Sequence, residues 1–146
     1  MIQIREMQFD DLEGVMEIEN ANFSTPWTET GFFTFLIRDD TLFLVAEEEE
    51  KILGYCGIVM VQDEGDITNV AVAKELQNQG IGKQLVKELL LQTKTRGVKK
   101  VFLEVRASNA RAIHVYEKMG FEQISIRKNY YEAPTEDGLV MMHTAE

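Results

Sequence analysis

The sequence has few of the residues that cross-link, anchor or interrupt a chain. Its 146 residues include one cysteine and two prolines, and no apolar run approaches the ~20 residues that span a bilayer. The lone cysteine, Cys56, builds neither a disulfide framework nor a multi-cysteine zinc site, which favours a reducing compartment. The segment from Met1 to Glu6 contains no signal-peptide core. We therefore expect one soluble, cytoplasmic domain over residues 1–146, with no membrane partner.

Basic residues are also in deficit. Lys and Arg number 15 against 25 Asp and Glu, which gives a formal net charge of −10. A protein whose main partner is nucleic acid needs a basic face that neutralises phosphates, so this balance argues against direct nucleic-acid binding. The same balance is compatible with a cationic substrate that is attracted to an acidic surface.

The pattern of apolar residues predicts a mixed α/β architecture. Glu47–Lys51, an acidic run between two apolar segments, predicts a solvated hairpin turn. The predicted element order is β-α-α-β-β-β-α-β-α-β-β. Its strands are expected near residues 2–7, 41–47, 51–62, 65–73, 101–105, 121–128 and 138–143.

Four helices are expected, each with a recognisable start or stop. The first begins at Asp10 or Asp11, and Glu13 is placed for a capping box if Asp10 is the cap. Thr28 and Asn109 can cap the second and the fourth. The third, residues 80–96, carries a broad apolar stripe and ends at Gly97, while Gly120 stops the fourth.

The segment between the strand at 65–73 and the third helix suits a phosphate group. Gly80 and Gly82 let a ligand approach the backbone, and the helix start offers unpaired N–H groups and the positive dipole end. The sequence Gly80-Ile81-Gly82-Lys83 fits neither the P-loop nor the dinucleotide-binding pattern. A glycine-containing loop that merely starts a helix explains the local pattern about as well.

Several short motifs together resemble the GCN5-related N-acetyltransferase (GNAT) family. Gln77-x-x-Gly80-x-Gly82 after an apolar strand is similar to its Q/R-x-x-G-x-G/A signature. The longer matches resemble the family's ribosomal-protein alanine N-acetyltransferases, the RimI subfamily. They are Pro26-Trp27, the run from Leu103 to Asn109, Ala112, Tyr116-Glu117, Gly120-Phe121 and the run from Ile126 to Tyr131.

The resemblance covers nearly the whole chain and implies the GNAT fold, with a mixed, mostly antiparallel central sheet flanked by helices. It also implies acetyl-CoA as the acetyl donor. In such proteins one strand aligns the pantetheine arm, the loop after it holds the pyrophosphate, and an asparagine contacts the cofactor. The matching residues here are Val70, Ala71 and Val72, then Gln77, Asn78, Gln79, Gly80, Ile81, Gly82 and Lys83, and finally Asn109. Gln77 stands where many relatives carry Arg, which lowers the local positive charge.

Two residues match the catalytic positions of the subfamily. Glu104 lies within an apolar strand and would act as the general base, directly or through water. From the residues alone, a glutamate that reaches solvent or pairs with Arg106 or Arg111 is the simpler interpretation. Tyr116 would protonate the departing thiolate, and its alternative role is packing on a helix face. A backbone N–H near Val72 would polarise the thioester carbonyl.

The resemblance also implies the substrate, the N-terminal alanine of small ribosomal subunit protein eighteen, a basic chain. Trp27, Tyr130 and Tyr131 are predicted to contact the peptide, although core packing is at least as good an explanation for Trp27. His114 and His143 have no ligand-like spacing, so no metal is expected. The expected assembly is a monomer or a weak dimer.

Two other functions stay open on the sequence. A small-amine (polyamine or antibiotic) or lysine acetyltransferase would use the same fold with a reshaped groove. A non-catalytic acyl-CoA-binding module is the third hypothesis, and the presence of both Glu104 and Tyr116 speaks against it.

Overall fold

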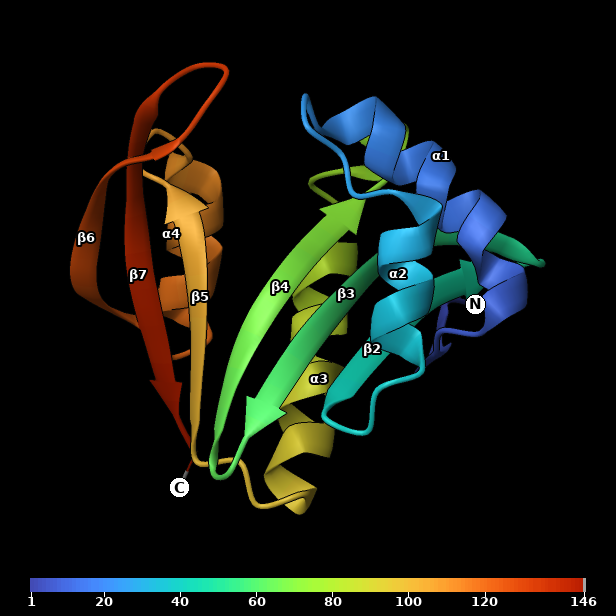
Figure 1. The fold of residues 1–146 in the computed structure, drawn as a ribbon, viewed down its shortest axis with the longest axis horizontal. Helices are drawn as coiled ribbons and strands as arrows, with labels where there is room; N and C mark the ends of the chain where they lie inside the picture. The colour runs from blue at the N-terminus through green and yellow to red at the C-terminus, as the bar shows by residue number, and fades with distance from the viewer. Residues whose placement is uncertain (146) are drawn as a thin grey trace.

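The computed structural model describes residues 1–145, and its elements follow the predicted order (Figure 1). Two short 3₁₀ turns, Phe9–Asp11 and Lys74–Leu76, precede α1 and α3. The helices are α1 (Leu12–Asn22), α2 (Glu29–Leu36), α3 (Ile81–Thr95) and α4 (Ala110–Lys118). The strands are β1 (Gln3–Glu6), β2 (Thr41–Glu48), β3 (Lys51–Val61), β4 (Glu64–Val72), β5 (Lys100–Arg106), β6 (Glu122–Tyr131) and β7 (Glu136–Thr144).

The strands form one sheet in the order β1-β2-β3-β4-β5-β7-β6. Neighbouring strands are antiparallel except for β4 and β5, which are parallel. These two pair only from Glu64 opposite Lys100 to Asp66 opposite Phe102, and beyond that point they diverge (Figure 1). The sheet is therefore split into two halves at the carboxyl ends of β4 and β5. The predicted mixed, mostly antiparallel sheet is confirmed.

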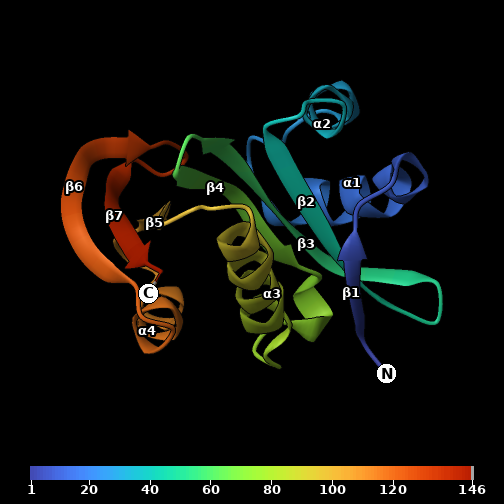
Figure 2. The same cartoon turned by 90° about the horizontal axis from the view of Figure 1, so that it is seen from below.

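The sheet separates two hydrophobic cores, because successive side chains of a strand point to opposite faces. In β2, Leu42 and Leu44 are buried in the core that includes α3, while Phe43 and Val45 are buried against α1 and α2. Figure 2 shows α3 and α4 on one side of the sheet and α2 on the other. Among residues 1–145, no helix has the length and apolar run needed to cross a membrane.

The helix ends follow most of the predicted signals. Thr28 Oγ1 accepts from the N–H of Gly31 at 3.0 Å, and Asn109 Oδ1 accepts from that of Ala112 at 3.1 Å. Each bond satisfies a donor that has no partner within its own helix. Gly97 and Gly120 follow α3 and α4 with positive φ, as the left-handed end of a helix requires.

The first helix starts after Asp11, one of the two expected residues, so the capping box that depended on Asp10 does not apply. Asp11 precedes α1, but its side chain makes no capping bond to that helix. Its carboxylate accepts from Arg5 Nη1 and Nη2 at 2.8 Å each, and from the N–H of Gln8 at 2.7 Å. Hydrogen bonding to Arg5 holds the pKa of Asp11 below its ordinary value. Arg5 belongs to β1. The residues at the start of α1 therefore gave no indication that Asp11 would bind Arg5.

The last hairpin is longer than predicted. Tyr130 and Tyr131, expected in the loop after the strand, belong to β6, and β7 begins at Glu136. A Cβ at Gly138 would come within 3.1 Å of both Tyr130 Cδ2 and Tyr131 Cε2. The glycine of β7 therefore leaves room for the two rings, which the apolar pattern alone did not indicate.

Candidate active site

Two adjacent grooves lie where β4 and β5 diverge. The first has a volume of about 490 Å³ and is formed by the end of β4, the loop into α3 and one side of α4. It brings together every predicted cofactor-binding residue except Gln79. These are Val70, Ala71, Val72, Gln77, Asn78, Gly80, Ile81, Gly82, Lys83 and Asn109.

The second groove, of about 630 Å³, contains the predicted base Glu104 and the predicted substrate contact Tyr131. Its opposite wall comes from the loop between α1 and α2, at residues 23–25. The residues that line both grooves are Asn22, Phe23, Val70, Asn109, Ala112 and Tyr116. Tyr116 therefore lies where a donor in one groove would meet an acceptor in the other.

The first groove has the features of an anion site. Gly80 precedes α3 with φ of 87°, and nothing lies within 4 Å of the position that a Cβ would take there. The first N–H groups of a helix have no acceptor within it, and the dipole adds positive potential. Lys83 adds an exposed cation in the first turn. These residues fit a pyrophosphate approaching the backbone.

The carbonyl of Val72 is engaged by two side chains of the protein. Asn22 Nδ2 donates to it at 2.7 Å, and Gln77 Nε2 donates at 3.2 Å. The amide of Gln77 therefore faces the strand. This contact ties the end of α1 and the loop after β4 to the same strand end.

Glu104 is on the face of β5 that the alternating pattern predicts, opposite the buried Val101, Leu103 and Val105. Its Oε2 is buried without a hydrogen-bond partner and lies 3.5 Å from Arg127 Nε. A hydrogen bond to Glu104 and its charge raise the pKa of Tyr130. Of the simpler interpretation, the described residues show no pairing with Arg106 or Arg111, while the Glu104 side chain keeps 28% exposure to solvent. The ion pair is with Arg127.

Tyr116 of α4 is half-buried, and its ring meets that of Phe121 edge-on at 5.6 Å between centroids. Burial, with a smaller contribution from Cys56, raises its pKa to about 12. The hydroxyl is consequently protonated at neutral pH. A proton donor for a thiolate leaving group needs this protonation state.

Arg106 is a residue of this site that the sequence reasoning missed. It follows Glu104 by two residues on β5, and its guanidinium lies over the ring of Tyr131 at 4.6 Å. It also donates to the carbonyls of Glu132 at 2.8 Å and Pro134 at 2.9 Å. Arg106 thus holds the hairpin that forms one wall of the second groove. Strand alternation places it on the face of Glu104, and that signal was available.

Two predicted substrate contacts lie outside the lining of the grooves. Trp27 is half-buried and packs against Phe32 and Phe35, each with 5.0 Å between ring centroids. It belongs to the core beneath α1 and α2. Tyr130 is exposed and meets Tyr131 edge-on at 5.0 Å. The structure brings together Glu104, Tyr116 and Tyr131, with Tyr130 beside them.

Cys56 lies outside the lining of both grooves. Cys56 is fully buried in the core with α3, and burial raises the pKa of its thiol far above the usual range. Thiolate chemistry is therefore unavailable to it near neutral pH. Within residues 1–145, no group of three or more His, Cys, Asp or Glu is arranged around a possible metal position.

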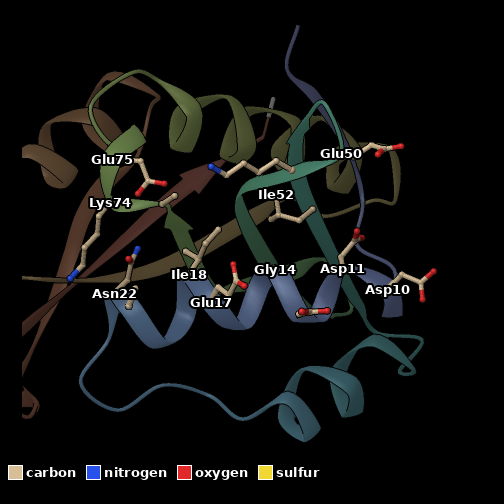
Figure 3. Close-up of a pocket in the computed structure, with 14 residues that line it drawn as sticks. Asp10, Asp11, Gly14, Glu17, Ile18, Asn22, Glu50, Ile52, Lys74 and Glu75 are labelled. Carbon is tan, nitrogen blue, oxygen red and sulfur yellow. The ribbon is translucent and has the colours of Figure 1, made fainter.

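A third groove, of about 520 Å³, lies between α1, the β2–β3 turn and the 3₁₀ turn before α3 (Figure 3). Its acidic residues include Asp10, Glu17, Glu50 and Glu75. In Figure 3 the side chains of Asp10 and Glu50 point outward. The groove contains none of the predicted site residues. Its acidic side chains account for part of the net negative charge of the protein.

Comparison with known proteins agrees with this geometry. The model of the acetyltransferase (GNAT) family matches residues 12–121. The Salmonella typhimurium protein named [ribosomal protein bS18]-alanine N-acetyltransferase is 36% identical over 133 residues, covering 90% of this chain and 89% of that protein.

Two solved structures extend the comparison. The ribosomal-protein-S18-alanine N-acetyltransferase from Escherichia coli superposes with a TM-score of 0.92 at 34% identity, covering 99% of this chain and 94% of that one. PaiA N-acetyltransferase from Thermoplasma acidophilum, solved in complex with coenzyme A, has a TM-score of 0.82 at 19% identity. It covers 99% of both chains and shares the fold.

The family model spans most of the sequence, and the relatives match along nearly their whole length. The resemblance read from the motifs is therefore confirmed, and with it the fold class and the type of enzyme. The chain belongs to the acetyltransferase (GNAT) family, is similar to its RimI-type alanine N-acetyltransferases, and is an acyltransferase.

Proposed function

We propose that this enzyme transfers the acetyl group of acetyl-CoA to the N-terminal α-amino group of a basic ribosomal protein that begins with alanine, of the bS18 type. One observation carries the proposal. The groove with the anion-binding helix start and the groove with Glu104 meet at Tyr116. Donor and acceptor can therefore approach one another directly. The relatives named for bS18 support the choice of acceptor.

The donor would bind in the first groove. The N–H groups at the start of α3 and the ammonium of Lys83 would hold its pyrophosphate. Val70, Ala71 and Val72 at the end of β4 would align the pantetheine arm along the strand. A coenzyme A complex of a protein with the same fold is consistent with this assignment.

The reaction needs two proton movements. An α-amino group has a pKa of ~7.7–8.0 against ~10.4 for lysine, so it reaches the neutral form near physiological pH far more readily. Glu104 would accept the proton that the amine loses as its nitrogen bonds to the thioester carbonyl. When the carbon–sulfur bond breaks, Tyr116 would give its proton to the sulfur. With a ribosomal protein as acceptor, we expect the reaction to take place in the cytoplasm.

Glu104→Gln tests the catalytic assignment. With release of coenzyme A thiol as the readout and an alanine-starting basic peptide as acceptor, kcat should fall about 100-fold, because an amide cannot accept the proton. The KM for acetyl-CoA should stay unchanged, since Glu104 lies in the other groove. Unchanged turnover would show that Glu104 is not the base.

An acceptor panel and a control variant complete this test. Polyamines, aminoglycosides and lysine side chains should be acetylated far more slowly than the peptide. A preference for any of them would contradict the proposed acceptor. Cys56→Ala should keep most of the activity, since transfer is direct. Mass measurement of ribosomal protein N-termini with and without the enzyme identifies the acceptor.

A further inference from the structure

A buried carboxylate in α1 takes no part in the proposed reaction. Glu19 is 3% exposed, and Tyr55 beneath it is fully buried. Glu19 Oε1 accepts from the hydroxyl of Tyr55, and Glu19 Oε2 accepts from the backbone N–H of Trp27 at 2.9 Å. One side chain thus joins α1 to the centre of β3 and to the loop before α2.

The position is unfavourable for a negative charge. Glu19 lies in the last turn of α1, where the helix dipole repels anions. No Lys or Arg in the described part of the chain forms an ion pair with it. Burying a carboxylate without a cation costs stability, and the two hydrogen bonds that Glu19 accepts offset part of that cost.

The loop held by Glu19 forms a wall of the second groove. Phe23, Ser24 and Thr25 line that groove across from Glu104 and Tyr131. Among the backbone N–H groups of residues 24–27, the described structure shows a hydrogen bond only for that of Trp27. Pro26 has no N–H at all. The Glu19 contact is consequently the main polar anchor between the end of α1 and the start of α2.

The ring of Trp27 supplies the apolar part of the same anchor. It is stacked on Phe35 and lies beside Phe32, which is itself fully buried. Glu19 fixes the backbone of Trp27 from one side while the aromatic rings hold its side chain. The two contacts together hold the loop at Trp27, two residues after Thr25.

We propose that Glu19 is a positioning residue for the acceptor: through the N–H of Trp27 it sets the groove wall at Ser24 and Thr25, which line the second groove alone. This inference rests on the proposed function, because it assigns the second groove to the acceptor peptide. Glu19 lies outside the lining of both grooves. Its loss should therefore weaken acceptor binding and leave donor binding unchanged.

Two substitutions separate positioning from packing. Glu19→Leu keeps the volume but leaves the N–H of Trp27 and the hydroxyl of Tyr55 unpaired, and the KM for an alanine-starting basic peptide should rise about tenfold. Glu19→Gln retains a carbonyl oxygen for the N–H of Trp27, so its KM should stay within about threefold of the original. The KM for acetyl-CoA should not change in either variant. Glu17→Leu, an exposed glutamate on the same helix, is the matched control.

Trp27 provides a readout that does not depend on activity, since it is the one tryptophan in the sequence. In Glu19→Leu its fluorescence should shift to longer wavelength and acrylamide should quench it more strongly. Glu19→Gln and Glu17→Leu should resemble the unmodified protein. A protein that acetylates no peptide would contradict the proposed function, yet the quenching comparison would still decide the role of Glu19.

Two outcomes overturn the inference. One is a Glu19→Leu protein with the original peptide KM and the original quenching. The other is an equal rise in the KM values for peptide and acetyl-CoA, which indicates a general structural role. If Glu19→Leu does not fold, hydrogen exchange on the unmodified protein decides. The amide of Trp27 should exchange much more slowly than those of Ser24 and Thr25, and equal rates reject the anchor.

Discussion

At the residue scale, the proposed acid and base have different environments. Tyr116 is half-buried between two grooves, and burial raises its pKa to about 12. Glu104 faces Arg127 and the exposed Tyr130, so its carboxylate has a cation and a hydroxyl nearby. A proton donor and a proton acceptor need opposite protonation states at the start of the reaction. The raised pKa of Tyr116 favours the protonated form that the donor needs.

Tyr116→Phe tests the donor. Without the hydroxyl, kcat should fall about 100-fold while the KM for acetyl-CoA stays unchanged. Because the pKa of Tyr116 is raised to about 12, the hydroxyl keeps its proton through the neutral and mildly alkaline range. The pH–rate profile of the unmodified enzyme should therefore show no decline from Tyr116 below about pH 10. Unchanged kcat in Tyr116→Phe would refute the assignment, whereas a decline near pH 9 that disappears in Tyr116→Phe would contradict the raised pKa.

The orientation of a single side chain was predictable where it depends only on neighbouring residues in the sequence. Alternation along one strand is enough to place Glu104 on the face opposite Val101 and Leu103. It does not find Arg127, which lies on β6 and reaches Glu104 past the intervening strand β7. That contact depends on the order of strands in space.

At the element scale, turns and helix ends follow short-range chemistry. The hairpin turn predicted at Glu47–Lys51 is confirmed, with Glu48 paired to Lys51. Glu49 and Glu50 between them both have positive φ, at 52° and 66°. Residues with a Cβ adopt this region at a cost, whereas two-residue hairpin turns prefer Asn-Gly. The turn therefore contains local strain.

Replacing Glu49-Glu50 by Asn-Gly should stabilise the protein by about 1 kcal/mol, since both residues tolerate positive φ. Urea unfolding measures this difference. The double variant with Gln at both positions is the control, because it removes the same charge and keeps the strain. If the Gln variant is as stable as the Asn-Gly variant, charge repulsion among the glutamates explains the effect instead.

At the scale of the whole molecule, charge is unevenly distributed. The groove in Figure 3 gathers Asp10, Glu17, Glu50 and Glu75, whereas the first groove has Lys83 and Arg111. A basic peptide is attracted by the overall charge of −10. An anionic donor must bind against that charge, through backbone N–H groups and the dipole of α3.

Salt should therefore act differently on the two substrates. Raising the ionic strength from about 0.05 M to about 0.5 M should increase the KM for a basic acceptor peptide several-fold, because screening shortens the range of attraction. An alanine-starting peptide of the same length without Lys or Arg should show little change. Steady-state kinetics with both peptides measures this. Equal salt dependence would mean that the surface charge does not recruit the acceptor.

The sequence by itself determined the features whose causes lie within a few residues. These include the element order, the caps at Thr28 and Asn109, the glycine that opens α3 and the glutamate within β5. The motifs were also enough to indicate the family. Hydrogen bonds at helix ends and strand alternation act over one to four residues, so such patterns can be read directly.

Only the tertiary structure decided which distant residues share a site. The divergence of β4 from β5 makes the two grooves adjacent and places Tyr116 at their junction. The contact of Arg5 with Glu47 joins residues 42 positions apart, and that of Glu19 with Tyr55 joins residues 36 positions apart. Such contacts depend on how strands pair and helices pack, and no local pattern encodes them. The wall of the second groove is therefore a property of the fold.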